Sequence, residues 1–188
     1  MTPRRLRRIG AKLICGLGVG LLLVVEVLRA QEAPPSEYQI KAAFLFNFAK
    51  FVEWPAKAFA TPTSPLIIGV LGDNPFGDDL ERTVRGKSVN NHPLVIREKL
   101  VSITDATNCH VIFISSSESK QVPELLDAVR NTSVLTVSEM EHFTDAGGMI
   151  NFVLEANKIR FQINDDAAKK AGLKISSKLL SLAVQPSH

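Results

Sequence analysis

The side chains that most often carry out chemistry are few in this sequence and widely spaced. No two of the four histidines have the spacing of a metal-ligand pair. These histidines are His92, His110, His142 and His188. No serine lies in a strained nucleophile turn, and no nucleophile, base and orienting group stand out as a set. We therefore expect no catalytic residue, no metal site, no cofactor and no enzymatic activity.

Two segments have residue types that suit binding or acid-base chemistry, but each has a simpler interpretation. Asp165 and Asp166 form a carboxylate pair, yet they stand where the cap and first turn of a helix favour acidic residues. The loop at 72–77 follows a predicted strand and precedes a helix, which is the position of a phosphate-binding loop. It lacks the third glycine and the lysine of the known fingerprints. We expect helix capping in the first case and a strand-to-helix turn in the second.

A small-molecule crevice is one hypothesis for the remaining polar residues. In an open α/β sheet, ligands bind outside the carboxyl ends of the strands, where the 72–77 loop is expected. Two glycines before the strand at 149–154 serve either as a turn or as the rim of a pocket. The residues predicted to line a crevice for an aromatic or anionic ligand are Glu53, Asp73, Asn74, Gly147, Gly148 and Ser176.

Continuous apolar runs and alternating patterns predict the elements that position these residues. Runs bounded by turn residues indicate strands buried on both faces, and the alternating segment at 158–163 indicates a strand with one wet face. The predicted strands are 66–71, 94–96, 109–114, 134–137, 149–154 and 158–163. The predicted helices are 38–54, 76–84, 123–129, 165–171 and 176–183. This order predicts an α/β fold with a mostly parallel sheet covered by helices on both faces, and a C-terminal antiparallel hairpin.

The helix predicted at 38–54 is unusually rich in aromatic residues. Ser36 and Gln39 form a capping box at its start, and Trp54-Pro55 ends it. Its apolar residues recur at spacings of three and four but cover more than one stripe. The aromatic residues predicted to meet a partner or a second copy of the chain are Phe44, Phe46, Phe48, Phe51 and Trp54. Burial of these side chains against the sheet is the alternative, and the segment 176–183 is a second candidate surface.

The first thirty residues have the pattern of a secretory signal. A basic stretch at 4–12 precedes an apolar run at 13–25. Glu26 ends this run before it reaches the roughly 20 residues that a membrane-spanning helix needs, which favours a cleaved signal over an anchor. We expect export and cleavage after Ala30, with Ala33 as the alternative.

Removal of residues 1–30 changes the charge and the cysteine content. It takes six of the 22 basic side chains and one of the 19 acidic ones, so 16 and 18 remain and the net charge becomes about −2 rather than +3. This balance argues against nucleic-acid binding. About 158 residues remain, which suits a flexible start at 31–36 and a single domain at 37–185. Cys109 becomes the one cysteine, so no intramolecular disulfide is expected, and its apolar surroundings predict a buried thiol.

Seven blocks of the sequence resemble the YfiR-like periplasmic proteins. The longest covers residues 38–55, YQIKAAFLFNFAKFVEWP. The others follow in the same order at 68–72, 109–114, 134–137, 147–150, 161–164 and 173–180. The resemblance implies a periplasmic, Rossmann-like α/β domain that tends to dimerise and has no enzymatic activity.

The resemblance also implies a regulatory function. The family's best-understood role is to bind and repress the periplasmic sensor part of an inner-membrane diguanylate cyclase, which lowers cyclic-di-GMP and biofilm formation. An outer-membrane lipoprotein can sequester the repressor, and other members act on other membrane sensors. Some members carry disulfides that give redox control, but here Gly69 stands where the partner of Cys109 is expected, so that control is not carried over. A periplasmic small-molecule sensor or carrier is the alternative function.

Overall fold

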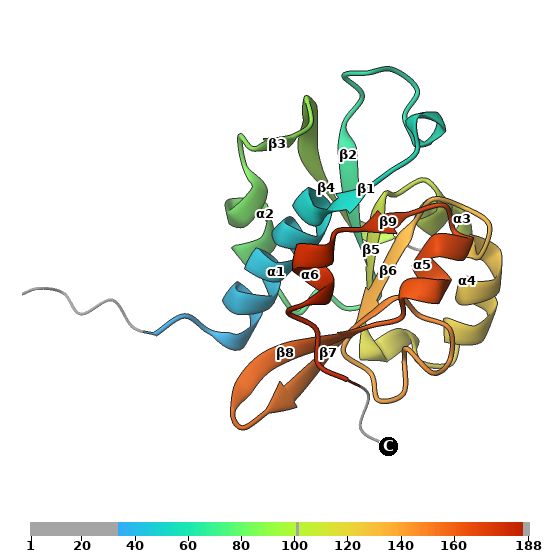
Figure 1. Ribbon diagram of the computed structural model, residues 1–188. Coiled ribbons are helices and arrows are strands. Elements are labelled where there is room, and N and C mark those ends of the chain that lie inside the picture. The colour runs from blue at the N-terminus through green and yellow to red at the C-terminus, as the bar shows by residue number, and fades with distance from the viewer. Residues whose placement is uncertain (1–33, 101, 186–188) are drawn as a thin grey trace, which may run out of the picture. The chain divides into compact units, whose positions relative to one another are not determined.

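A seven-stranded sheet forms the centre of the part of the chain that the computed structural model describes, residues 34–100 and 102–185 (Figure 1). Its strands lie in the order β3-β4-β2-β5-β6-β7-β8. Their bounds are Leu66–Leu71 for β2, Ser88–Val89 for β3, His92–Leu100 for β4, Val111–Ile114 for β5, Leu135–Ser138 for β6, Ile150–Glu155 for β7 and Lys158–Ile163 for β8. The strands from β4 to β7 are parallel, and β3 and β8 pair antiparallel at the two edges. The predicted α/β fold with a mostly parallel sheet is confirmed.

Helices cover both faces of this sheet, as the apolar strands require. They are α1 (Glu37–Phe51), α2 (Asp79–Val84), α3 (Ile103–Thr107), α4 (Val122–Val129), α5 (Asp165–Lys170) and α6 (Ser177–Leu180), with short 3-10 turns η1 (Ala56–Ala58) and η2 (Ser116–Glu118). On one face, Phe48 of α1 belongs to the same core as Val70 of β2. On the other face, Leu125 of α4 belongs to the same core as Ile112 of β5. Both layers are therefore held by apolar burial.

The first helix begins as predicted but ends earlier. Both hydrogen bonds of the capping box between Ser36 and Gln39 are present. The prediction that the helix continues to residue 54 is wrong, because Val52 and Glu53 form a short strand, β1 (Val52–Glu53). β1 pairs antiparallel with β9 (Lys174–Ile175), a strand that the sequence did not predict. Two-residue strands carry no periodic signal, so only the tertiary fold defines them.

The remaining differences concern short elements and boundaries. The helix predicted at 76–84 starts at Asp79, after a turn, and the final helix covers only Ser177–Leu180. The elements β3 and α3 were not predicted. β7 and β8 pair over six residues and turn at Ala156 and Asn157, which have positive φ angles of 48° and 58°. Such angles are typical of the tightest hairpin turns.

The expected signal at 1–30 and its cleavage sites at Ala30 and Ala33 lie outside the described residues. None of the helices in the described residues is both long and apolar enough to cross a membrane.

Candidate functional site

The aromatic residues predicted for an interface do not share one surface. Phe48 is fully buried, and its ring centroid lies 5.6 Å from that of Phe152 on β7. Phe44 is half-buried and stacks on Phe48 at 6.0 Å. Trp54 follows β1, and its Nε1 donates a hydrogen bond to the backbone carbonyl of Ser133 at 3.0 Å. These three side chains attach α1 and the segment after it to the sheet.

Phe46 and Phe51 are two half-buried phenylalanines of α1 whose rings lie close to lysines. Lys87 Nζ lies 4.4 Å from the ring centroid of Phe46, and Lys178 Nζ lies 5.2 Å from that of Phe51. Lys178 belongs to α6, which lies beside α1 (Figure 1). The two surfaces predicted separately, α1 and the segment 176–183, are therefore neighbours. We call Phe46, Phe51, Lys87 and Lys178 the aromatic–lysine surface.

A buried ion cluster at the start of α1 was missed by sequence reasoning. The side chain of Lys41 is only 5% exposed and donates to the carboxylates of both Glu37 and Glu139. The hydroxyl of Tyr38 donates to Glu139 Oε1 at 3.2 Å. Burial alone lowers the pKa of Lys41, but its hydrogen bonds to both carboxylates and their charges outweigh this effect and raise that pKa. A local signal existed, since Lys41 is four residues before Leu45 and seven before Phe48 and so falls on the buried stripe.

Two of the scattered histidines meet through an aromatic ring. Phe59 stacks between His92 and His110, with ring centroids 3.6 Å and 4.5 Å away. The Ile67 N–H donates to His110 Nδ1 at 3.1 Å, so Nε2 carries the proton and donates to the carbonyl of Ala58 at 3.0 Å. Burial lowers the pKa of His110, partly offset by that bond to Ala58. His110 is therefore held neutral, and its two hydrogen bonds connect β2 to η1.

The six residues predicted for a crevice are divided among separate places. Glu53 and Ser176 line one hollow of about 700 Å³ beside β9. Asp73 and Asn74 follow β2, at the opposite end of that strand from the Trp54 segment, and their bonds are structural. The Asp73 N–H donates to Ser117 Oγ at 3.0 Å, and Asn74 Oδ1 accepts from the N–H of Phe76 at 2.9 Å.

Gly147 and Gly148 are required for different reasons, the first for its backbone conformation and the second for close packing. Gly147 has a φ angle of 102°, a conformation that favours glycine, and it lines a cavity described below. A Cβ on Gly148 would lie 2.2 Å from the ring of Phe143, which is itself buried. One glycine is thus needed for the turn and the other for close packing.

The acidic pair Asp165–Asp166 lies in the first turn of α5. The N-cap is Asn164 rather than either aspartate, because the Asn164 side chain accepts from the Ala167 N–H at 3.0 Å. Asp165 pairs with Lys169 at 2.6 Å. Both aspartates are placed where the positive end of the helix dipole favours them.

Cys109 is a free, buried thiol. Burial raises its pKa to about 11, so very little thiolate exists at neutral pH. Gly69 of β2 faces it, and a Cβ built on Gly69 would lie 2.6 Å from Cys109 Sγ. In the described residues, no group of three or more His, Cys, Asp and Glu side chains is arranged to hold a metal ion.

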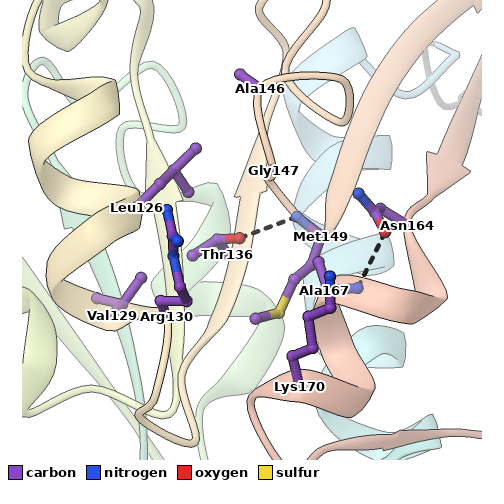
Figure 2. Close-up of a pocket in the computed structure, with 10 residues that line it drawn as sticks. All are labelled: Leu126, Val129, Arg130, Thr136, Ala146, Gly147, Met149, Asn164, Ala167 and Lys170. Carbon is purple, nitrogen blue, oxygen red and sulfur yellow. Dashed lines mark hydrogen bonds between the residues drawn. The ribbon is translucent and has the colours of Figure 1, made fainter.

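The cavity drawn in Figure 2 has a volume of about 280 Å³ and lies between α4, the start of β7 and α5. Apolar side chains such as Leu126 and Met149 line it, and two cationic side chains, Arg130 and Lys170, stand at its edge. Of the predicted crevice residues, only Gly147 belongs to it.

Comparisons with known proteins identify the family. A family model described as YfiR/HmsC-like matches residues 38–184, which is nearly the whole described domain. No curated protein matches the sequence. Among solved structures, the fold resembles the crystal structure of a conserved domain protein from Vibrio cholerae O1 biovar El Tor str. N16961, with a TM-score of 0.56 and 13% sequence identity. The similarity covers 80% of this chain and 60% of that one, and at this identity it shows the fold alone.

Proposed function

The chain belongs to the YfiR/HmsC-like family, and on that premise we propose that it is a periplasmic regulatory protein without enzymatic activity. In this proposal it binds and represses the periplasmic sensor part of an inner-membrane diguanylate cyclase, or of another membrane sensor. Repression lowers cyclic-di-GMP and with it biofilm formation. The match over residues 38–184 carries the proposal, because the family is regulatory and periplasmic. The cleaved signal at 1–30 supplies the export that such a role requires.

The aromatic–lysine surface is the part of the molecule that we assign to the partner or to a second copy. Aromatic side chains are enriched in protein interfaces, and polar and charged side chains surround them at the rim. Phe46 is the probe of this surface, because its side chain is half-buried and Lys87 Nζ lies beside its ring. The two phenylalanines lie on α1, Lys178 lies on α6 and Lys87 lies between α2 and β3. Two aromatic rings beside two lysines favour a partner with acidic and apolar groups. A homodimer and capture by an outer-membrane lipoprotein belong to the same proposal.

The test uses the gene in the organism that carries it. Deletion raises cellular cyclic-di-GMP and biofilm, and the wild-type gene restores both. Phe46→Asp fails to restore them although the purified variant still unfolds cooperatively, with a midpoint only a few degrees lower than that of the wild type. Leu154→Asp is the matched control, because Leu154 is 67% exposed on a different element, the β7–β8 hairpin. An unchanged cyclic-di-GMP level after deletion overturns the regulatory role, whereas full restoration by Phe46→Asp overturns only the assigned surface.

A periplasmic small-molecule sensor or carrier is the second candidate. The observation that favours it is the hollow shared by Glu53 and Ser176. A thermal-shift screen against aromatic and anionic periplasmic metabolites tests it. A hit that Ser176→Ala weakens supports a ligand there, and silence across the panel counts against it.

A further inference from the structure

The cavity in Figure 2 exists because β7 separates from β6 at their amino ends. Backbone pairing of the two parallel strands begins at Val137 and Ile150. One residue earlier, the Met149 N–H donates to the side-chain Oγ1 of Thr136 at 3.0 Å, so a side chain replaces the backbone partner there. α4 and α5 flank the opening and leave about 280 Å³ between them. The cavity is thus bounded by the sheet and two helices, and the loop before β7 adds Ala146 and Gly147 to its lining.

The interior of this cavity is apolar and adaptable. Leu126 and Val129 of α4 are 8% and 1% exposed, and Met149 is 3% exposed. Ala167 of α5 adds only a methyl group on the opposite side. The unbranched thioether of Met149 can change rotamer at little cost, as methionines at variable binding surfaces do. Such a lining accepts a flat apolar group.

Two cations stand at the rim with no acid among the lining residues. Arg130 is the C-cap of α4 and Lys170 is the last residue of α5, and in Figure 2 their side chains flank that of Met149. Arg130 pairs with Asp127, which is exposed and does not line the cavity. For Lys170, no ion pair is formed within the described part of the chain. The uncompensated charge at the rim is therefore positive.

Asn164 and Thr136, the uncharged polar side chains that line the cavity, both form hydrogen bonds within the protein. Asn164 Oδ1 accepts from the Ala167 N–H, and Asn164 Nδ2 donates to the carbonyl of Thr144, both at 3.0 Å. Thr136 Oγ1 accepts from Met149. The charged donors available for recognition are those of Arg130 and Lys170, which suit a carboxylate.

We propose that this cavity binds a small organic anion with an apolar body, of the aryl carboxylate class. The ring lies against Met149 and Leu126, and the carboxylate meets Arg130 and Lys170. This site is separate from the aromatic–lysine surface and from the hollow at Glu53 and Ser176, so it does not depend on the repressor role.

Methionine-methyl NMR tests the proposal on the chain that starts at residue 31. Beyond any initiator, this chain has two methionines, Met140 and Met149. Phenylacetate at millimolar concentrations is expected to move the Met149 methyl signal and leave that of Met140 unchanged. Phenylacetamide has the same shape without the charge. Its affinity is expected to be about fivefold lower than that of phenylacetate. If the Met149 signal does not move with phenylacetate, or if the amide binds as tightly, the proposal is overturned.

Variants separate the charges from the apolar lining. Arg130→Gln and Lys170→Gln are each expected to weaken phenylacetate binding by roughly twofold to fivefold. Ala167→Leu places an isobutyl group in the cavity and is expected to abolish the signal change. Lys169→Gln is the matched control, since Lys169 is the neighbour of Lys170 but pairs with Asp165 and does not line the cavity. An equal loss in Lys169→Gln shows that only general surface charge matters and contradicts a built site.

Discussion

Lys41 Nζ lies 2.5 Å from Glu139 Oε2 and joins the first helix to the residue after β6, 98 positions later in the chain. The lysine is 5% exposed and the glutamate side chain 18% exposed, so water screens this pair poorly. Removal of one partner from such a pair leaves the other charge without compensation, and this costs several kcal/mol.

Lys41→Met is therefore expected to lower the free energy of unfolding by about 3 kcal/mol. Urea titration followed by circular dichroism measures the change. Lys50→Met is the control on the same helix, since Lys50 is exposed, and it is expected to change stability by about 0.5 kcal/mol or less. The double variant Lys41→Met/Glu139→Gln should recover part of the loss, because the buried Glu139 charge is then removed as well and the charge left without Lys41 is that of the exposed Glu37. Equal effects of the two lysine variants contradict a structural role for the cluster.

Phe48 and Phe46 are expected to respond very differently to truncation. Phe48→Ala empties a site in the core and should cost about 3–5 kcal/mol. Phe46→Ala removes a half-buried ring and should cost about 1 kcal/mol. Denaturant unfolding of both variants decides whether the aromatic residues of α1 serve packing or an exposed surface. A loss for Phe46→Ala as large as that for Phe48→Ala would place Phe46 in the core and remove the basis for the aromatic–lysine surface.

Gly69→Cys is expected to form a disulfide with Cys109. A Cβ at position 69 would lie 3.6 Å from the Cβ of Cys109, within the range found in disulfides. It would also lie 2.6 Å from Leu100 Cδ1, which is the end of a flexible side chain and has to move. The bridge closes a loop of about 40 residues, for which chain entropy gives a stabilisation of about 3–4 kcal/mol.

Thiol titration and thermal unfolding, with and without reductant, check the Gly69→Cys variant. The oxidised variant should show no free thiol and a higher unfolding midpoint than the reduced one. Gly69→Ala is the control for the added Cβ alone. Two persistent free thiols after oxidation would mean that position 69 and Cys109 are too far apart for a disulfide and would contradict the 3.6 Å Cβ separation.

His110 should make the domain less stable in acid. Its folded pKa is lowered below the ordinary value of about 6.5. Above that pH both the folded and unfolded forms are neutral at this residue. Below it, the unfolded chain takes a proton that the folded one resists, so stability falls until the pH passes the folded pKa and then levels off. The fall should be accompanied by a change in fluorescence of Trp54, the one tryptophan, whose ring centroid is 6.5 Å from that of His110.

Comparison of wild type with His110→Gln isolates this residue from other titrating groups. The stability difference between the two should be largest near neutral pH and should shrink as the pH falls below 6.5. His142→Gln is the control, because the His142 side chain is 82% exposed. A difference between wild type and His110→Gln that stays constant with pH would contradict the coupling.

The elements with strong local signals were predictable from the sequence. The capping box set the start of α1, and the apolar runs located β2 and β5 to within two residues. These signals act between residues a few positions apart, which is why a single sequence reveals them.

The features that depend on distant residues were not predictable in the same way. β1 and β9 have two residues each and exist only because Val52 meets Ile175. His92 and His110 are brought together by Phe59, and nothing in their spacing indicates it. Asn164 caps α5 where the aspartates were expected, because its amide also reaches the carbonyl of Thr144. The candidate sites mostly depend on such contacts between distant residues. The sequence therefore indicates the family through its local blocks but does not indicate the geometry of the sites.

The pairing of β1 with β9 means that the N-terminal part of the domain gains its tertiary contacts late in synthesis. Synthesis proceeds from the N-terminus, so α1 is available long before the residues that hold it. Lys41 can form its ion pair only after Glu139 has been synthesised, and Val52 can pair only after Ile175 has been synthesised. Until then Phe44 and Phe48 of α1 lack Phe152 and Phe161, the rings on β7 and β8 against which they pack. A truncation that removes β9 should therefore leave the start of the domain unprotected from proteases, although the cut lies at the far end of the chain.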